Sequence, residues 1–135
     1  MAPTGSLSLK GSYLRTKLKL QHVQQCIMPI INVWHRLSDP EALKHIPRKA
    51  GAYELANKYR TVIYIGHAKG GNLHRRIQDH TREYAKDCIR RNAVYFRYMV
   101  MRAYATGERT LFREYKAKHN NKIPACNARD PSLSH

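Results

Sequence analysis

The sequence predicts an α+β domain in which a small three-stranded antiparallel sheet is flanked by helices. Two short runs rich in β-branched and aromatic residues, 52–55 and 61–65, are separated by a polar group. This composition is typical of a hairpin with a four- or five-residue loop. A third run of the same kind, 94–101, predicts the third strand, and helically spaced apolar residues precede and follow it.

Length and charge limit the classes of protein. The 135 residues fit one domain of common size. An excess of 25 Lys and Arg over 9 Asp and Glu gives a formal net charge of +16, which indicates a polyanionic partner. A ribosome-type structural protein and an anionic membrane surface are the alternatives. Since no apolar run approaches the length of a membrane span and no secretory signal follows Met1, we expect a cytoplasmic protein without a membrane partner.

The cysteines and histidines show no metal-binding spacing. Three cysteines, Cys26, Cys88 and Cys126, are widely spaced and form no C-x-x-C motif. We therefore expect them to be small buried hydrophobic residues rather than disulfide partners or zinc ligands. The eight histidines likewise form no known zinc-ligand pattern.

The N-terminal third reads as an extension to the sheet domain. Residues 1–45 are interpreted as a basic arm with a helical extension, because apolar positions recur at near-helical spacing over 13–28. The run 30–37 is either a strand or a buried connection. Residues 38–41 have the form of a capping box with an early proline, which predicts a short helix that ends before Pro47.

Two further helices follow the hairpin in the predicted domain, 46–127. Asn72 is placed to cap a helix over 73–88. Thr106 is placed to cap a second helix that runs from about residue 107 to 119. An extended segment then closes the domain, and 128–135 is expected to be a flexible tail.

Helical geometry sorts the cations of the first of these helices. A rotation of about 100° per residue puts His80 in line with Leu73 and Ile77, with Arg76 at the border of that apolar face. Arg75 points to solvent. The structural alternative is that His80 is a core histidine with satisfied hydrogen bonds and Arg76 an edge cation.

The second helix carries a carboxylate on its apolar face. Glu108 lies in line with Leu111, Phe112 and Tyr115. Such a carboxylate is costly unless it is paired, hydrogen-bonded or bound to a metal, and its structural alternative is a buried ion pair with an arginine. Glu114 lies off this face and is expected to be solvated.

Together these residues resemble the GIY-YIG nuclease superfamily. The pattern is closest to the GIY-YIG restriction endonucleases and to the incision nuclease domain of nucleotide-excision repair. The matching segments are Gly51-Ala52-Tyr53, Tyr64-Ile65-Gly66, Leu73-His74-Arg75-Arg76 with His80, Glu108 with Leu111 and Phe112, and Pro124-Ala125-Cys126-Asn127.

The resemblance implies a metal-dependent endonuclease that hydrolyses DNA phosphodiester bonds. Glu108 would hold one Mg²⁺ or Mn²⁺, which needs few protein ligands. Arg76 would bind the scissile phosphate. Tyr53 and Tyr64 would position or deprotonate the attacking water, and His80 would orient a tyrosine or act as the base. The choice between Tyr53 and His80 as general base stays open.

Asn127 completes the implied catalytic set, and Ala52 at the centre of the first tripeptide should be silent because it faces away from Tyr53. His67 stands where the family commonly has lysine or serine. The expected partner is double-stranded DNA, and a homodimer would suit a double-strand cut. The residues expected to contact DNA are Lys10, Arg15, Lys17, Lys19, His67, Lys69 and Arg75.

Two questions of function stay open at this stage. The biological role could be that of a restriction enzyme or of a phage or mobile-element enzyme. The alternative to catalysis is a catalytically weak nucleic-acid-binding or ribosome-associated protein on the same scaffold.

Overall fold

A computed structural model describes residues 33–133 of the chain. The helix predicted over 13–28 lies outside this range. The described elements, in chain order, are β1 His35–Arg36, α2 Pro40–Lys44, β2 Gly51–Ala56, β3 Val62–Ala68, α3 Leu73–Asp79, α4 Asp87–Asn92, β4 Tyr95–Val100, α5 Tyr104–Lys118 and a 3-10 helix, η2, Pro131–Leu133. None of the helices in this range combines the length and apolar character that a membrane crossing requires.

The α+β class is confirmed, but the sheet has four strands rather than three. Its order is β1-β4-β2-β3, and every neighbouring pair is antiparallel. The additional strand, β1, pairs His35 with Phe96 of β4. Both β1 and α2 precede residue 46, where the predicted nuclease-like domain begins, so the sheet includes residues before that boundary. A strand of two residues has no side-chain period that a sequence could reveal.

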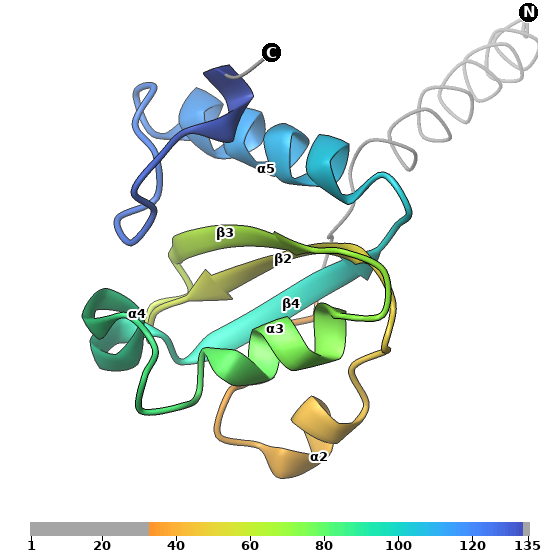
Figure 1. Ribbon diagram of the computed structural model, residues 1–135. Helices are drawn as coiled ribbons and strands as arrows, with labels where there is room; N and C mark the ends of the chain where they lie inside the picture. The colour runs from red at the N-terminus through yellow and green to blue at the C-terminus, as the bar shows by residue number, and fades with distance from the viewer. Residues whose placement is uncertain (1–32, 134–135) are drawn as a thin grey trace, which may run out of the picture.

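The sheet separates two clusters of buried side chains. On one side, α5 covers the sheet, and on the other lie α3 and α2, with α4 beyond the far end of the strands (Figure 1). Tyr53 and Leu55 pack into the cluster on the α3 side, whereas Ala52 packs with Phe112 of α5. This confirms that Ala52 and Tyr53 face opposite sides of β2, as the alternation of side chains along a strand requires.

The helix predicted over 73–88 is two helices. α3 ends at Asp79, and α4 begins only at Asp87. The hydroxyl of Thr81 donates to the carbonyl of Gln78 at 2.7 Å, and this local bond accompanies the end of α3. Tyr84, which was expected to face inward, is 70% exposed in the intervening turn. The apolar residues of α3 and α4 together follow one helical spacing, and for this reason the sequence predicted a single helix.

Helix starts also differ from the predicted ones. α5 begins at Tyr104, so Thr106 lies inside the helix, where its carbonyl accepts from the Thr110 hydroxyl at 2.9 Å. Asn72 does hold the N-cap position of α3, but its side chain makes no capping bond. In α2 the cap is Asp39, whose carboxylate accepts from the backbone nitrogen of Glu41 at 3.0 Å.

Cys88 and Cys126 form a disulfide, contrary to the prediction of unpaired cysteines. The bond joins α4 to the segment that closes the domain. The two positions are 38 residues apart, and nothing in their spacing indicates that these segments meet. Cys26 lies outside the described residues.

The C-terminal segment packs against α5 instead of forming the loose tail that we expected. Lys116 of α5 donates to a carboxylate oxygen of Asp130 at 2.6 Å, and both side chains are nearly buried. The backbone nitrogen of Ser132 donates to the other oxygen of Asp130 at 2.9 Å. Residues 128–133 are therefore part of the domain, and they lie beside the sheet edge where the candidate site is found.

Candidate active site

Tyr53, Tyr64 and His80 form an aromatic cluster on the α3 side of the sheet. In the β2–β3 ladder Tyr53 is opposite Gly66 and Leu55 is opposite Tyr64, so both tyrosines face the same way. His80 stands at the C-cap of α3 and brings Nε2 to 2.7 Å from the Tyr53 hydroxyl. Its ring centroid lies 5.1 Å from that of Tyr64. Three residues of the predicted catalytic set are thus brought together.

Gly66 makes room for this cluster. A Cβ atom at this position would lie 2.5 Å from both Cζ and the hydroxyl oxygen of Tyr53. Such an approach is far inside van der Waals contact, so the Tyr53 ring can lie across β3 only because its cross-strand neighbour has no side chain. The glycine of the second tripeptide therefore has a steric role.

Burial determines the protonation states in the cluster. Tyr53 is fully buried, and this burial, followed by the neighbouring Tyr64, raises the pKa of its phenol. Burial also raises the pKa of Tyr64. Burial and then the positive charge of Arg76 lower the pKa of His80 to about 4. At neutral pH both phenols keep their protons and the imidazole is neutral, so the hydrogen bond between the Tyr53 hydroxyl and Nε2 of His80 joins two uncharged groups.

Arg76 acts on this cluster and Arg75 does not. The charge of Arg76 lowers the pKa values of Tyr53, Tyr64 and His80. For the two phenols this opposes burial, which raises their pKa values, whereas for His80 both effects lower the pKa. Arg75 instead acts on exposed Tyr84 in the turn after α3. Both arginines are exposed, but only the charge of Arg76 acts on the cluster, which agrees with the side of α3 predicted for it.

Glu108 approaches from the other side of the sheet edge, on α5. Its side chain is 13% exposed, and one carboxylate oxygen lies 3.0 Å from Nδ1 of His67. The distance suits an ion pair when His67 is protonated, although the orientation does not satisfy hydrogen-bond geometry. The His67 ring stacks on Tyr104 at 5.1 Å. His67, predicted to contact DNA, is thus engaged with Glu108.

The buried ion pair with an arginine that was considered for Glu108 is instead formed by Glu54. Arg97 donates from Nε to buried Glu54 at 2.7 Å, and its guanidinium lies over the Trp34 ring at 4.0 Å. Burial outweighs Arg97 and raises the pKa of Glu54. Glu114, expected to be solvated, is half-buried beside this pair, and burial and then Glu54 raise its pKa. Among the ion pairs of residues 33–133, none joins Glu108 to an arginine.

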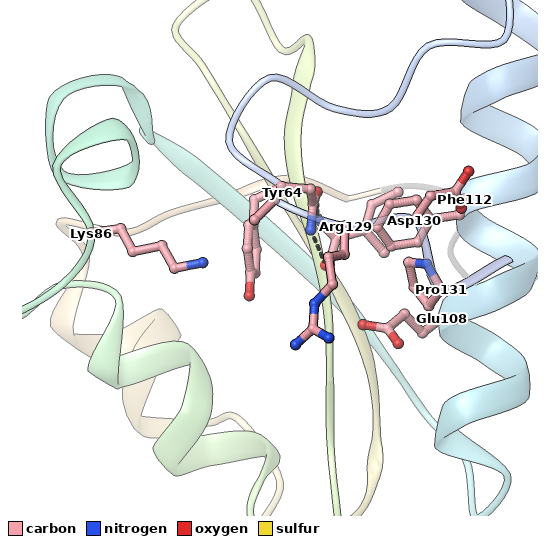
Figure 2. Close-up of a pocket in the computed structure, with 10 residues that line it drawn as sticks. Tyr64, Lys86, Glu108, Phe112, Arg129, Asp130 and Pro131 are labelled. Atoms are coloured by element: carbon pink, nitrogen blue, oxygen red, sulfur yellow. Dashed lines mark hydrogen bonds between the residues drawn. The ribbon is translucent and has the colours of Figure 1, made fainter. Parts of the chain in front are cut away.

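A cleft of about 380 Å³ opens along this edge of β3. Tyr64 and Glu108 both border it, and Figure 2 shows Lys86 and Arg129 reaching toward it from opposite sides of Tyr64. Neither cation was singled out from the sequence. No periodic pattern marks them, because Lys86 precedes a short helix and Arg129 lies in the closing segment.

Asn127 also borders the cleft, but its amide is used within the fold. Its Oδ1 accepts from the backbone nitrogen of Ile65 at 2.9 Å, and its Nδ2 donates to the carbonyl of the same residue at 3.0 Å. The neighbouring backbone nitrogen of Cys126 donates to Ile63 at 2.8 Å. Asn127 therefore ties the closing segment to β3 directly beside Tyr64, which is the geometry of a positioning residue.

The remaining predicted DNA contacts are divided between the surface and the part of the chain outside 33–133. Lys69 and Arg75 are exposed near the start of α3. Lys10, Arg15, Lys17 and Lys19 lie outside the described residues.

The cleft residues fit a single hard cation better than a multi-ligand metal centre. Between residues 33 and 133 there is no group of three or more His, Cys, Asp or Glu side chains that could hold a metal. Of the two carboxylates at the cleft, Asp130 is paired with Lys116, which leaves Glu108 as the candidate ligand. One carboxylate beside an open cleft suits Mg²⁺ or Mn²⁺, because such ions retain several waters.

The sequence matches no model of a known protein family, and it matches no curated protein. The resemblance to GIY-YIG nucleases therefore depends on the residue pattern and the geometry described above.

Proposed function

We propose that this protein is a metal-dependent DNA endonuclease of the GIY-YIG type. The observation that carries the proposal is the hydrogen bond between Tyr53 and His80 beside Tyr64, with the Arg76 charge acting on all three. Of these residues Tyr64 borders the cleft, and the Glu108 carboxylate borders it too. Tyr64 connects the two parts, because it also packs against His80. A proton-accepting group and a carboxylate on either side of one tyrosine, with a cation acting on that tyrosine, can serve phosphodiester hydrolysis.

The proposed roles follow from exposure and protonation. Tyr64 borders the cleft and would orient the attacking water, whereas fully buried Tyr53 would link Tyr64 to His80. The raised phenol pKa values disfavour a tyrosinate, so neutral His80 is the better proton acceptor of the cluster. Arg76 would neutralise the scissile phosphate. Water would form the new bond to phosphorus as the bond to the 3′ oxygen breaks, leaving 5′-phosphate and 3′-hydroxyl ends.

Glu108 would hold the divalent cation. When bound, this ion would stabilise negative charge on the phosphate and the leaving oxygen. His67 lies 3.0 Å from the Glu108 carboxylate and would help to keep it at the cleft.

The second candidate is a nucleic-acid-binding protein without catalysis, and the net charge of +16 favours it equally. The two candidates differ in what they require of Glu108. A binding protein gains nothing from a carboxylate that borders a cleft with cations at its rim, because this charge repels phosphate.

Incubation of the purified protein with plasmid DNA separates the two candidates. We expect nicked or linear product with Mg²⁺ or Mn²⁺ and none in excess chelator. Ligation of the product would report whether the ends are 5′-phosphate and 3′-hydroxyl. Binding without cleavage under all metal conditions would favour the second candidate, and equal cleavage in chelator would remove the metal from the proposal.

A further inference from the structure

Two cations that the proposed mechanism does not use lie at the cleft. Lys86 occupies the N-cap position of α4, and its Nζ lies 5.7 Å from the centre of the Tyr64 ring. Arg129 borders the same cleft from the closing segment. Figure 2 shows the two side chains on opposite sides of Tyr64, the tyrosine to which we assign the attacking water.

The segments that carry these cations are fixed to each other. The disulfide partner Cys88 follows Lys86 by two positions, and its partner Cys126 precedes Arg129 by three. The Arg129 segment is further held by the double hydrogen bond of Asn127 to Ile65. The backbone segments of the two cations are thus linked by a covalent bond, so their relative position does not depend on two independent loops.

The nearest acidic neighbours in sequence are already occupied. Asp87 pairs with Arg90, and Asp130 pairs with Lys116 at 2.6 Å. Within residues 33–133 no ion pair involves Lys86 or Arg129. Glu108 borders the same cleft, but none of the ion pairs of residues 33–133 joins it to either cation. Two cations at one cleft that are not paired with its carboxylate form an attractive site for an anion.

We propose that Lys86 and Arg129 form a phosphate-binding subsite for the nucleic-acid backbone, separate from the scissile phosphate assigned to Arg76. The choice of nucleic acid as ligand rests on the proposed function, and the subsite defines where the strand next to the cleavage point would lie. The strand would pass along the edge of β3, across Tyr64, between α4 and the closing segment. Substrate binding would then depend on residues that exchange no proton in the proposed mechanism, although the charge of Lys86 is also one of the causes that lower the pKa of His80.

Charge-matched variants test the subsite through DNA binding alone. Lys86→Gln and Arg129→Gln each remove one cleft cation, whereas Lys122→Gln and Arg113→Gln remove exposed cations that do not border the cleft. Fluorescence anisotropy with a short labelled DNA duplex, without divalent cations, would give the affinity at several salt concentrations. Thermal melts of all variants would verify folding.

Loss of one phosphate contact reduces the slope of log affinity against log salt by about 1. We therefore expect a reduction of about 1 for each cleft variant and about 2 for the double variant, with clearly smaller changes in the two controls. Equal changes in cleft and control variants, or cleft variants that bind as tightly as the unaltered protein, would overturn the subsite. The test does not need cleavage. An inactive but DNA-binding protein would refute the endonuclease while this comparison still decides the subsite.

Discussion

The hydroxyl of Tyr53 lies 2.7 Å from Nε2 of His80, although 27 positions separate the two residues in the sequence. The contact joins the central strand β2 to the end of α3 and passes above β3 at Gly66. A fully buried phenol thereby gains a partner for its hydroxyl, which a buried polar group requires. The proposed site depends on this contact.

Gly66→Ala should disrupt the aromatic cluster, because the new methyl group would lie 2.5 Å from atoms of Tyr53. We expect a loss of about 1–3 kcal/mol in the free energy of unfolding, as for overpacked cores, and loss of cleavage. Gly70→Ala is the matched control, since a Cβ there meets nothing within 4 Å. Denaturant unfolding and a nicking assay would measure both effects. Indistinguishable stability of the two variants would contradict the steric role of Gly66.

Arg76→Ala should abolish cleavage with a modest loss of DNA binding, whereas Arg75→Ala should affect binding at most. The reason is that Arg76 alone of these two acts electrostatically on Tyr53, Tyr64 and His80. Cleavage rates and DNA affinities of the two variants, measured side by side, test the assignment. Matching losses of activity would show that the two side chains are not distinguished by the helix phase.

Glu108→Gln should abolish cleavage while DNA binding holds or tightens, because a negative charge at the cleft is removed. Its ion-pair partner His67 is 37% exposed, and exposed ion pairs contribute little to stability, so the melting temperature should change little. Glu114→Gln is the control, because Glu114 lies on the same helix but does not border this cleft. An active Glu108→Gln beside an inactive Glu114→Gln would move the site along α5.

Glu54→Gln should destabilise the fold without a direct effect on the site. It removes the partner of Arg97, whose side chain is only 22% exposed, and a stranded buried cation costs about 3 kcal/mol or more. Comparison of its denaturant midpoint with that of Glu108→Gln separates a structural carboxylate from the proposed catalytic one. If the midpoint for Glu54→Gln were as high as that of Glu108→Gln, the contact with the Trp34 ring would be sufficient to stabilise the Arg97 side chain.

His80 should make the protein less stable in mild acid. Burial and Arg76 lower its pKa from 6.5 to about 4, so between these values the unfolded chain takes up a proton that the folded one does not. The free energy of unfolding is therefore highest, as far as His80 is concerned, above pH 6.5, and it decreases as the pH falls toward 4. Below pH 4 His80 causes no further decrease, because it is protonated in both states.

His80→Gln should flatten the decline of melting temperature between pH 6.5 and 4. The control is His45→Gln, at the exposed C-cap of α2, which should leave the decline as it is. Equal slopes of melting temperature against pH for the unaltered protein and His80→Gln would show that His80 has the same pKa in the folded and the unfolded chain.

The amino-acid sequence by itself determined the features that follow from local periodicity. The β2–β3 hairpin, β4 and the body of α5 appear where the alternation or helical spacing of apolar residues predicted them. The same geometry correctly separated Ala52 from Tyr53, and it predicted the side of α3 from which the charge of Arg76 acts on the cluster. These properties depend on neighbours within a few residues, and backbone geometry relates such neighbours in a fixed way.

Only the tertiary structure decided the features that depend on segments far apart in the chain. The short strand β1 exists because β4 offers it a partner, and the disulfide exists because α4 meets the closing segment. The pairing of Glu108 with His67, and the approach of Lys86 and Arg129 to one cleft, are likewise set by packing across the sheet edge. The physical reason is the same for all these features. The spacing of apolar residues within one segment carries no information about which distant side chains it will contact.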